Sequence, residues 1–151
     1  MPISVANPLR GPRIALSLRA LVRAALSLED QTPGDIGIVL TGDRTLRELN
    51  RRYRRLDRTT DVLSFRYHDG GRVAHGEVFV SLDRMGEQAR RYRVSRGREL
   101  ARLVVHGVLH LAGLDHHAPA ERRYMRRREA QALRLGAAHI RVLERTLDRS
   151  R

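Results

Sequence analysis

Three histidines close together in the chain have the spacing of a metal site. They occur in the stretch His106-Gly-Val-Leu-His110-Leu-Ala-Gly-Leu-Asp-His116. On a helix, residues four apart project from the same side, so His106 and His110 can reach one ion. A helix continued straight would place His116 roughly 9 Å along the axis from His110, at about 1.5 Å per residue. Gly113 predicts a tight turn that returns His116 to the pair, because glycine tolerates positive φ.

Three neutral imidazoles with an open fourth position form the catalytic type of zinc site, in which a bound water is acidified. The chain has no cysteine, so a thiolate site is excluded. His117 is the alternative third ligand, and the spacing favours His116. Zinc is the expected ion, although imidazole sites also accept nickel, copper or cobalt.

The residue after the first histidine indicates which reaction the site can run. Zinc peptidases of the metzincin type carry a glutamate there, which serves as the general base. In this chain the position is Gly107. The ligands are therefore present without the peptidase base. A phosphodiester substrate depends less on that glutamate, because the metal and a cationic side chain can neutralise the phosphate.

The charge of the chain favours a polyanionic partner. All 30 basic residues are arginine, against 17 acids, which gives a formal net charge of +13. The planar arginine fork suits phosphate, so nucleic acid is the expected partner class. A GC-rich genome would explain the missing lysine but not the excess of base over acid. The sequence shows no apolar run of about 18 residues and no signal segment, so we expect a cytoplasmic protein without membrane contact.

The elements that must position these residues follow from the apolar spacing. The helix that carries the histidines, at 98–112, is apolar almost all round, as expected of a buried central helix. Asp43 is the expected N-cap of a helix, and residues 67–75 are expected to form a loop. Strands are expected at 3–7, 36–40, 62–66 and 77–82, and other helices at 13–28, 43–53, 83–92, 119–136 and, as a possible C-terminal extension, 137–151. The prediction is one α+β domain over 1–151, with a small mixed sheet and helices around it.

Three sequence blocks resemble the YbeY family of bacterial metal-dependent endoribonucleases. The motif at 106–116, H-G-x-L-H-L-x-G-x-D-H, is similar to the signature of that family. The segment 50–65, N-x-x-Y-R-x-x-D-x-x-T-D-V-L-S-F, and the segment 76–81, G-E-V-F-V-S, resemble two further blocks of it. The resemblance covers about residues 35–136. It implies a four-stranded mixed sheet surrounded by about five helices, with a zincin-like metal helix beneath a positively charged groove.

The resemblance also implies a function. Our prediction is a zinc-dependent endoribonuclease that acts on single-stranded RNA, and the resemblance further implies work on ribosomal RNA, including maturation of the 3′ end of the small-subunit RNA and ribosome quality control. RNA and the ribosome are then the expected partners, and DNA is not. Arg54 matches a family arginine near the metal, whose role would be to hold the scissile phosphate. Either a metal-activated water or a ribose 2′-hydroxyl could attack phosphorus, and the sequence leaves this choice open.

Two carboxylates, Asp115 and Glu77, each have more than one possible role. Asp115 either accepts the second N–H of a ligand imidazole or only caps the turn. Glu77 could act as such an acceptor or as a proton carrier, or be an ordinary exposed carboxylate.

Two functions other than RNA cleavage are also possible. The chain could be a ribosome-assembly factor that binds RNA and holds a structural metal. It could also be a metal hydrolase of another bond.

Overall fold

The computed structural model describes residues 3–7, 9, 12–67 and 71–148, and these form four strands and six helices in one α+β arrangement. The predicted fold class is confirmed, with six helices where about five were expected. The elements are β1 (Ile3–Ala6), α1 (Pro12–Ser27), β2 (Thr32–Thr41), α2 (Asp43–Arg54), β3 (Val62–Arg66), β4 (Val73–Ser81), α3 (Leu82–Tyr92), α4 (Arg96–Leu111), α5 (Pro119–Leu135) and α6 (Ala137–Leu147).

The sheet is mixed, and its strand order is β1-β2-β4-β3. β1 and β4 run parallel to β2, whereas β3 pairs antiparallel with β4. Side chains alternate between the two faces of a strand, and the alternate apolar residues of β2 and β4 are buried. They are Ile36, Ile38, Leu40, Val78 and Val80. α1 and α4 pack against this apolar face, and α5 and α6 complete one hydrophobic core with them.

Two strands begin earlier than the sequence pattern predicts. β2 starts at Thr32, and its register with β4 shifts between Pro33 and Ile36. The turn-forming residues at 33–35 are therefore absorbed as an irregularity inside a strand. β4 starts at Val73, so 73–75 belong to the sheet rather than to the predicted loop, and 68–70 lie outside the described residues.

The caps of two helices also differ from the prediction. Gly42 is the N-cap of α2, and Asp43 is its first helical residue. The Asp43 carboxylate instead accepts a hydrogen bond from the Ser81 hydroxyl, at 2.6 Å. Ser81 caps α3 by accepting the backbone N–H of Arg84, so Leu82 begins that helix and does not end the strand. The hydrogen bond between Asp43 and Ser81 joins segments that are far apart in sequence, so local sequence could not predict it.

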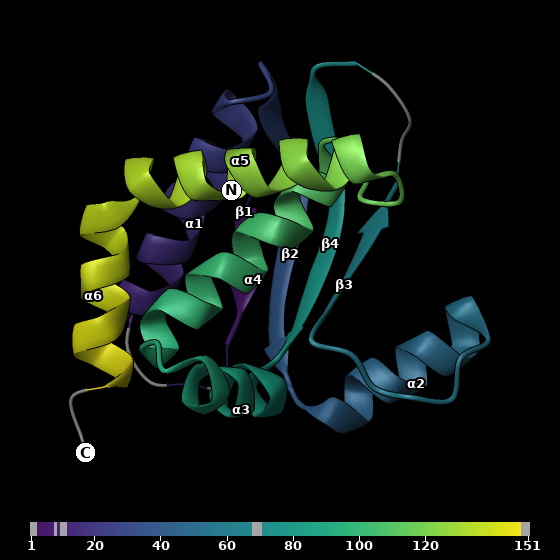
Figure 1. Cartoon of the computed structure of the whole chain (residues 1–151), viewed down its shortest axis with the longest axis horizontal. Helices are drawn as coiled ribbons and strands as arrows, with labels where there is room; N and C mark the ends of the chain where they lie inside the picture. The colour runs from purple at the N-terminus through teal and green to yellow at the C-terminus, as the bar shows by residue number, and fades with distance from the viewer. Residues whose placement is uncertain (1–2, 8, 10–11, 68–70, 149–151) are drawn as a thin grey trace.

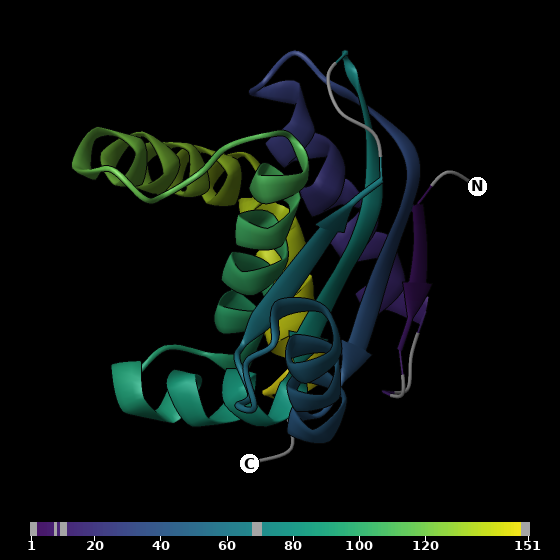
Figure 2. The ribbon, with the colours of Figure 1, turned by 90° about the vertical axis from the view of Figure 1, so that its right-hand side faces the viewer.

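The fourth helix is the centre of the molecule. α4 packs against β3 and β4 on one side and contacts α1, α3, α5 and α6 on the others. Figure 1 shows α4 crossing in front of the sheet, with α5 above it and α6 beside it. After a quarter turn, α4, α5 and α6 all lie on the same side of the sheet (Figure 2). The predicted central buried helix is confirmed.

The C-terminal helix joins the same core. Ile140, Leu143 and Leu147 of α6 are buried against the rest of the molecule. The Cβ that an alanine would place at Gly97 of α4 would lie 2.5 Å from the Glu144 backbone nitrogen, so α4 and α6 approach closely. The segment 137–148 is therefore docked, and 149–151 lie outside the described residues. None of the helices described is long and apolar enough to cross a membrane.

Candidate metal centre

The turn that ends α4 is built as the sequence predicts. Gly113 has φ +101°, a conformation that side chains other than glycine rarely adopt. Its N–H donates to the His110 carbonyl at 3.0 Å, and the Leu114 N–H donates to the Leu109 carbonyl at 3.0 Å. This pair of bonds is the Schellman arrangement, which satisfies the free carbonyls of a helix end. The chain then reverses and carries His116 back towards α4.

The three predicted histidines meet at this turn. Ring centroids lie 4.9 Å apart for His106 and His110, 4.8 Å for His110 and His116, and 5.5 Å for His106 and His116. One nitrogen from each ring lies within 4.8 Å of the other two. His117 is not part of this group; its ring stacks beside His116 at 5.8 Å. The fold therefore brings His116, which the spacing favours, to the pair.

The donor set fits a divalent transition metal. Nitrogens bound to one tetrahedral zinc ion lie roughly 3.3 Å apart, because each bond is about 2.0–2.1 Å. The nitrogens, which lie within 4.8 Å of one another, therefore need to approach by at most about 1.5 Å to share an ion. His106 and His110 are half-buried on α4, whereas His116 is exposed. Two of the candidate ligands come from α4 and the third from the turn after it.

The surroundings of His110 keep its imidazole neutral. Burial, together with the neighbouring His106 and His116 imidazoles, lowers the pKa of His110 to about 4. Asp115 acts in the opposite direction. A neutral imidazole has a free nitrogen lone pair at neutral pH, which is the form that binds a metal.

A carboxylate that the sequence reading missed also belongs to the site. Glu129 Oε2 of α5 lies 3.0 Å from Nδ1 of His106. Glu129 follows the buried Met125 by one helical turn, so it shares the face that α5 packs against α4. The helical spacing on α5 was the available signal, but only the fold shows which element this face meets.

Of the two roles left open for Asp115, the contacts support the turn. Its Oδ1 accepts the backbone N–H of His116 at 2.9 Å and lies 3.1 Å from His117 Nε2. Among the described residues, no hydrogen bond joins Asp115 to a ligand imidazole.

The other predicted carboxylate is not brought to the histidines. Glu77 follows Gly76 on β4 and points away from the face that its neighbour Val78 presents to α4. The Tyr67 hydroxyl donates to the Glu77 carboxylate on that other face. Burial and this carboxylate raise the pKa of Tyr67 to about 12. Glu77 therefore has a local partner and no contact with the metal group.

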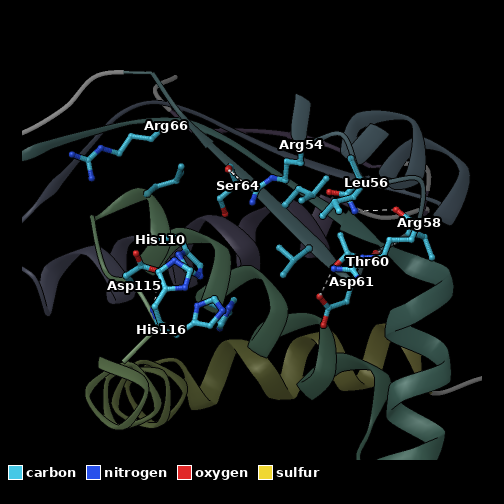
Figure 3. Close-up of a pocket in the computed structure, with 17 residues that line it drawn as sticks. Arg54, Leu56, Arg58, Thr60, Asp61, Ser64, Arg66, His110, Asp115 and His116 are labelled. Carbon is cyan, nitrogen blue, oxygen red and sulfur yellow. Dashed lines mark hydrogen bonds and ion pairs between the residues drawn. The ribbon is translucent and has the colours of Figure 1, made fainter. Parts of the chain in front are cut away.

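The histidines form one wall of a cavity of about 710 Å³. The opposite wall comes from the end of α2, the segment after it and β3, and it contributes Arg54, Arg58 and Arg66. Figure 3 shows Arg54 and Ser64 on this wall, across from His110 and His116. The structure thus brings Arg54 and the three histidines into one cavity. Arg58 and Arg66 are basic lining residues that the sequence did not distinguish from the other arginines.

Arg54 is held only loosely at this wall. Its Nη2 donates to the Ser64 carbonyl at 3.3 Å, and its guanidinium lies 5.8 Å from the centre of the Phe65 ring. A weak bond to a carbonyl is readily exchanged for a charge-assisted bond to a phosphate. The side chain is exposed and can therefore turn to a ligand in the cavity.

Gly107 shows why the peptidase glutamate has no place here. Position 107 faces the sheet, and a Cβ built on it would lie 2.4 Å from Val78 Cγ1 and 3.1 Å from Ser64 Oγ. The Ser64 hydroxyl donates to the Gly107 carbonyl at 2.8 Å, which fixes this close contact. A larger residue would push α4 away from the sheet. The alternative of a peptide hydrolase with that base is therefore not supported.

The fold and the site together define an α+β protein with a three-histidine centre at the end of a buried helix, facing a basic cavity. The family model described as Endoribonuclease YbeY matches residues 12–135. The chain belongs to the endoribonuclease YbeY family.

Curated relatives carry the same description. A protein of Anaeromyxobacter sp. (strain Fw109-5), named Endoribonuclease YbeY, is 42% identical over 83% of this chain and 66% of its own length. The protein of that name from Anaeromyxobacter dehalogenans matches over 65% of its length, so this chain spans just under two thirds of both. The Chlorobium phaeovibrioides protein of that name is 36% identical over 93% of this chain and 94% of its own.

A solved structure has the same fold. The solution structure of a Thermotoga maritima protein superposes with a TM-score of 0.61 at 25% sequence identity. The match covers 90% of this chain and 92% of that one. This likeness supports the described arrangement of sheet and helices.

Proposed function

We propose that this chain is a metal-dependent endoribonuclease that cuts single-stranded RNA and acts in the maturation of ribosomal RNA, including the 3′ end of the small-subunit RNA, and in ribosome quality control. One observation carries the proposal: three imidazoles and Arg54 line opposite walls of one cavity in a chain of this family. RNA and the ribosome would be its partners, in the cytoplasm, and residues 1–151 would act as one domain.

The histidines would hold a zinc ion. His106, His110 and His116 supply three nitrogens and leave a further coordination position for substrate or water. When bound, the ion supplies positive charge and Lewis acidity at the scissile phosphate. Other divalent transition metals could fill the same set, so zinc is proposed on the strength of the donor types.

The opposite wall would bind the RNA. Arg54 would exchange its bond to the Ser64 carbonyl for the scissile phosphate and stabilise the extra negative charge that develops in the transition state. Arg58 and Arg66 line the same cavity and would attract the neighbouring phosphates. Together these groups orient the phosphate towards the histidine wall.

Cleavage of a labelled single-stranded RNA by zinc-loaded protein tests the proposal. The same RNA annealed to its complement serves as the matched substrate, and a chelator followed by added zinc tests the metal requirement. We expect cleavage of the single strand only, loss of activity with the chelator and recovery with zinc. Equal cleavage with and without metal, or no cleavage of any RNA by loaded protein, would contradict the proposal.

A further inference from the structure

We infer that Glu129 is the positioning residue of the metal centre: its carboxylate fixes the ring of His106 so that Nε2 is the nitrogen presented to the ion. The observation is the 3.0 Å contact between Glu129 Oε2 and His106 Nδ1, between residues 23 apart in sequence on two different helices. The inference rests on the proposed metal site.

The contact fixes the position of the ring proton. A carboxylate can only accept a hydrogen bond, so the neutral imidazole of His106 carries its proton on Nδ1 and leaves the lone pair on Nε2. Metal-binding histidines commonly have such an acceptor on the nitrogen that does not bind, and it sets both the tautomer and the ring orientation. Glu129 stands in that position for His106.

Its other contact does not explain why Glu129 is there. The Glu129 side chain is only 13% exposed, so its charge needs a partner. Its Oε1 lies 4.0 Å from Arg102 Nη1, at the limit of an ion pair. Arg102 is already bound through two nitrogens to Glu99, at 2.7 and 3.0 Å. The short contact of Glu129 is therefore the one with His106.

The chain provides a matched control in Glu29, which follows α1 and contacts the same helix α5. Glu29 lies 2.9 Å from Arg128 of α5, and its side chain is 14% exposed, close to the 13% of Glu129. Both carboxylates therefore tie α5 to the rest of the molecule, but Glu29 contacts no histidine of the site among the described contacts. Replacing either one by glutamine removes a charge of similar burial.

Zinc affinity, measured by competition with a chromogenic chelator, tests the inference on wild type, Glu129→Gln and Glu29→Gln. We expect Glu129→Gln to bind zinc about 10- to 100-fold more weakly, as is typical when such a partner is lost. Glu29→Gln should keep the wild-type affinity while its metal-free protein melts at a lower temperature. Wild-type affinity in Glu129→Gln, or an equal loss in both variants, would reduce Glu129 to a structural tie between helices. Failure of wild type itself to bind zinc would instead remove the proposed metal centre, and this inference with it.

A second measurement needs no variant. Long-range ¹H–¹⁵N NMR spectra of the metal-free wild-type protein near pH 7.5 report which ring nitrogen of each histidine carries the proton. We expect the Nδ1–H tautomer for His106. The Nε2–H tautomer at His106 would overturn the inference even if Glu129→Gln did not fold.

Discussion

The two walls of the cavity are built in opposite ways. The histidine wall stands on α4, which packs against the sheet and four other helices, and its geometry is fixed by core contacts such as that of Gly107 with Val78. The arginine wall is the exposed end of α2 and the edge strand β3, where Arg54 has one long hydrogen bond. A metal requires ligands at set distances, whereas a phosphate must enter, be held and leave. The packed histidine wall therefore suits metal binding, and the exposed arginine wall suits the binding and release of a phosphate.

The largest effect is expected from the histidine wall. His110→Ala removes one of the three proposed ligands, and we expect zinc binding to be lost and RNA cleavage to fall by about 10³-fold or more. The variant should remain folded, because the buried residues Leu100, Val104 and Val108 hold α4 without the metal. Circular dichroism and chelator competition on the same sample check both points. An unfolded variant would favour the alternative of an RNA-binding assembly factor with a structural metal.

The arginine wall should show a different pattern. Arg54→Ala is expected to lower the cleavage rate by about 10²–10³-fold, because a donor to the developing charge is lost. Arg52→Ala is the matched control: Arg52 is an exposed arginine of the same helix that does not line the cavity. Its cleavage rate should stay within about twofold of wild type. Similar losses in both variants would mean that general charge on α2, and not Arg54 at the site, supports cleavage.

The stability of the metal-free protein should depend on pH through His110. The folded chain keeps this imidazole neutral down to about pH 4, whereas the unfolded chain takes up the proton near 6.5. Between these values the unfolded state binds more protons, so the free energy of unfolding falls as the pH is lowered from 6.5 to 4. We expect a loss of about 1–2 kcal/mol, reduced from the full shift by solvent screening.

Urea unfolding at several pH values, with chelator present, measures this slope. His110→Gln should flatten it, while His139→Gln, which changes an exposed histidine of α6, should leave it unchanged. An identical slope in all three proteins would assign the pH dependence to other groups.

The smallest effect is expected outside both walls, on the exposed arginines of α5. Arg126→Ala should weaken RNA binding only a few-fold and reduce the steepness of its salt dependence by about 0.7, the value for one phosphate contact on a single strand. Arg47→Ala is the comparison, because Arg47 is already paired with Asp57 at 2.9 Å. Fluorescence anisotropy at several salt concentrations measures both. A wild-type salt dependence in Arg126→Ala would mean that Arg126 makes no contact with an RNA phosphate.

The same contrast explains what the sequence could predict. The histidine group and the turn at Gly113 are local in sequence, so spacing and glycine chemistry were sufficient to find them. The helix and strand periodicities likewise gave the α+β class and the buried α4. Features that depend on two distant segments were missed. Glu129 reaches His106 from another helix, and the Asp43 carboxylate accepts a hydrogen bond from Ser81 instead of capping α2. The face of the sheet on which the Glu77 side chain lies depends on strand pairing. The sequence could therefore single out this residue but could not show what its side chain contacts.

The histidine wall is proposed to bind the metal and the arginine wall to bind the phosphate. The most direct test of these separate roles is the rate of RNA cleavage measured against zinc concentration, for wild type and Arg54→Ala. We expect both curves to reach half of their maximum at the same zinc concentration, with a plateau about 10²–10³-fold lower in Arg54→Ala. A shifted midpoint in Arg54→Ala, or cleavage by wild type that does not depend on zinc, would contradict these roles.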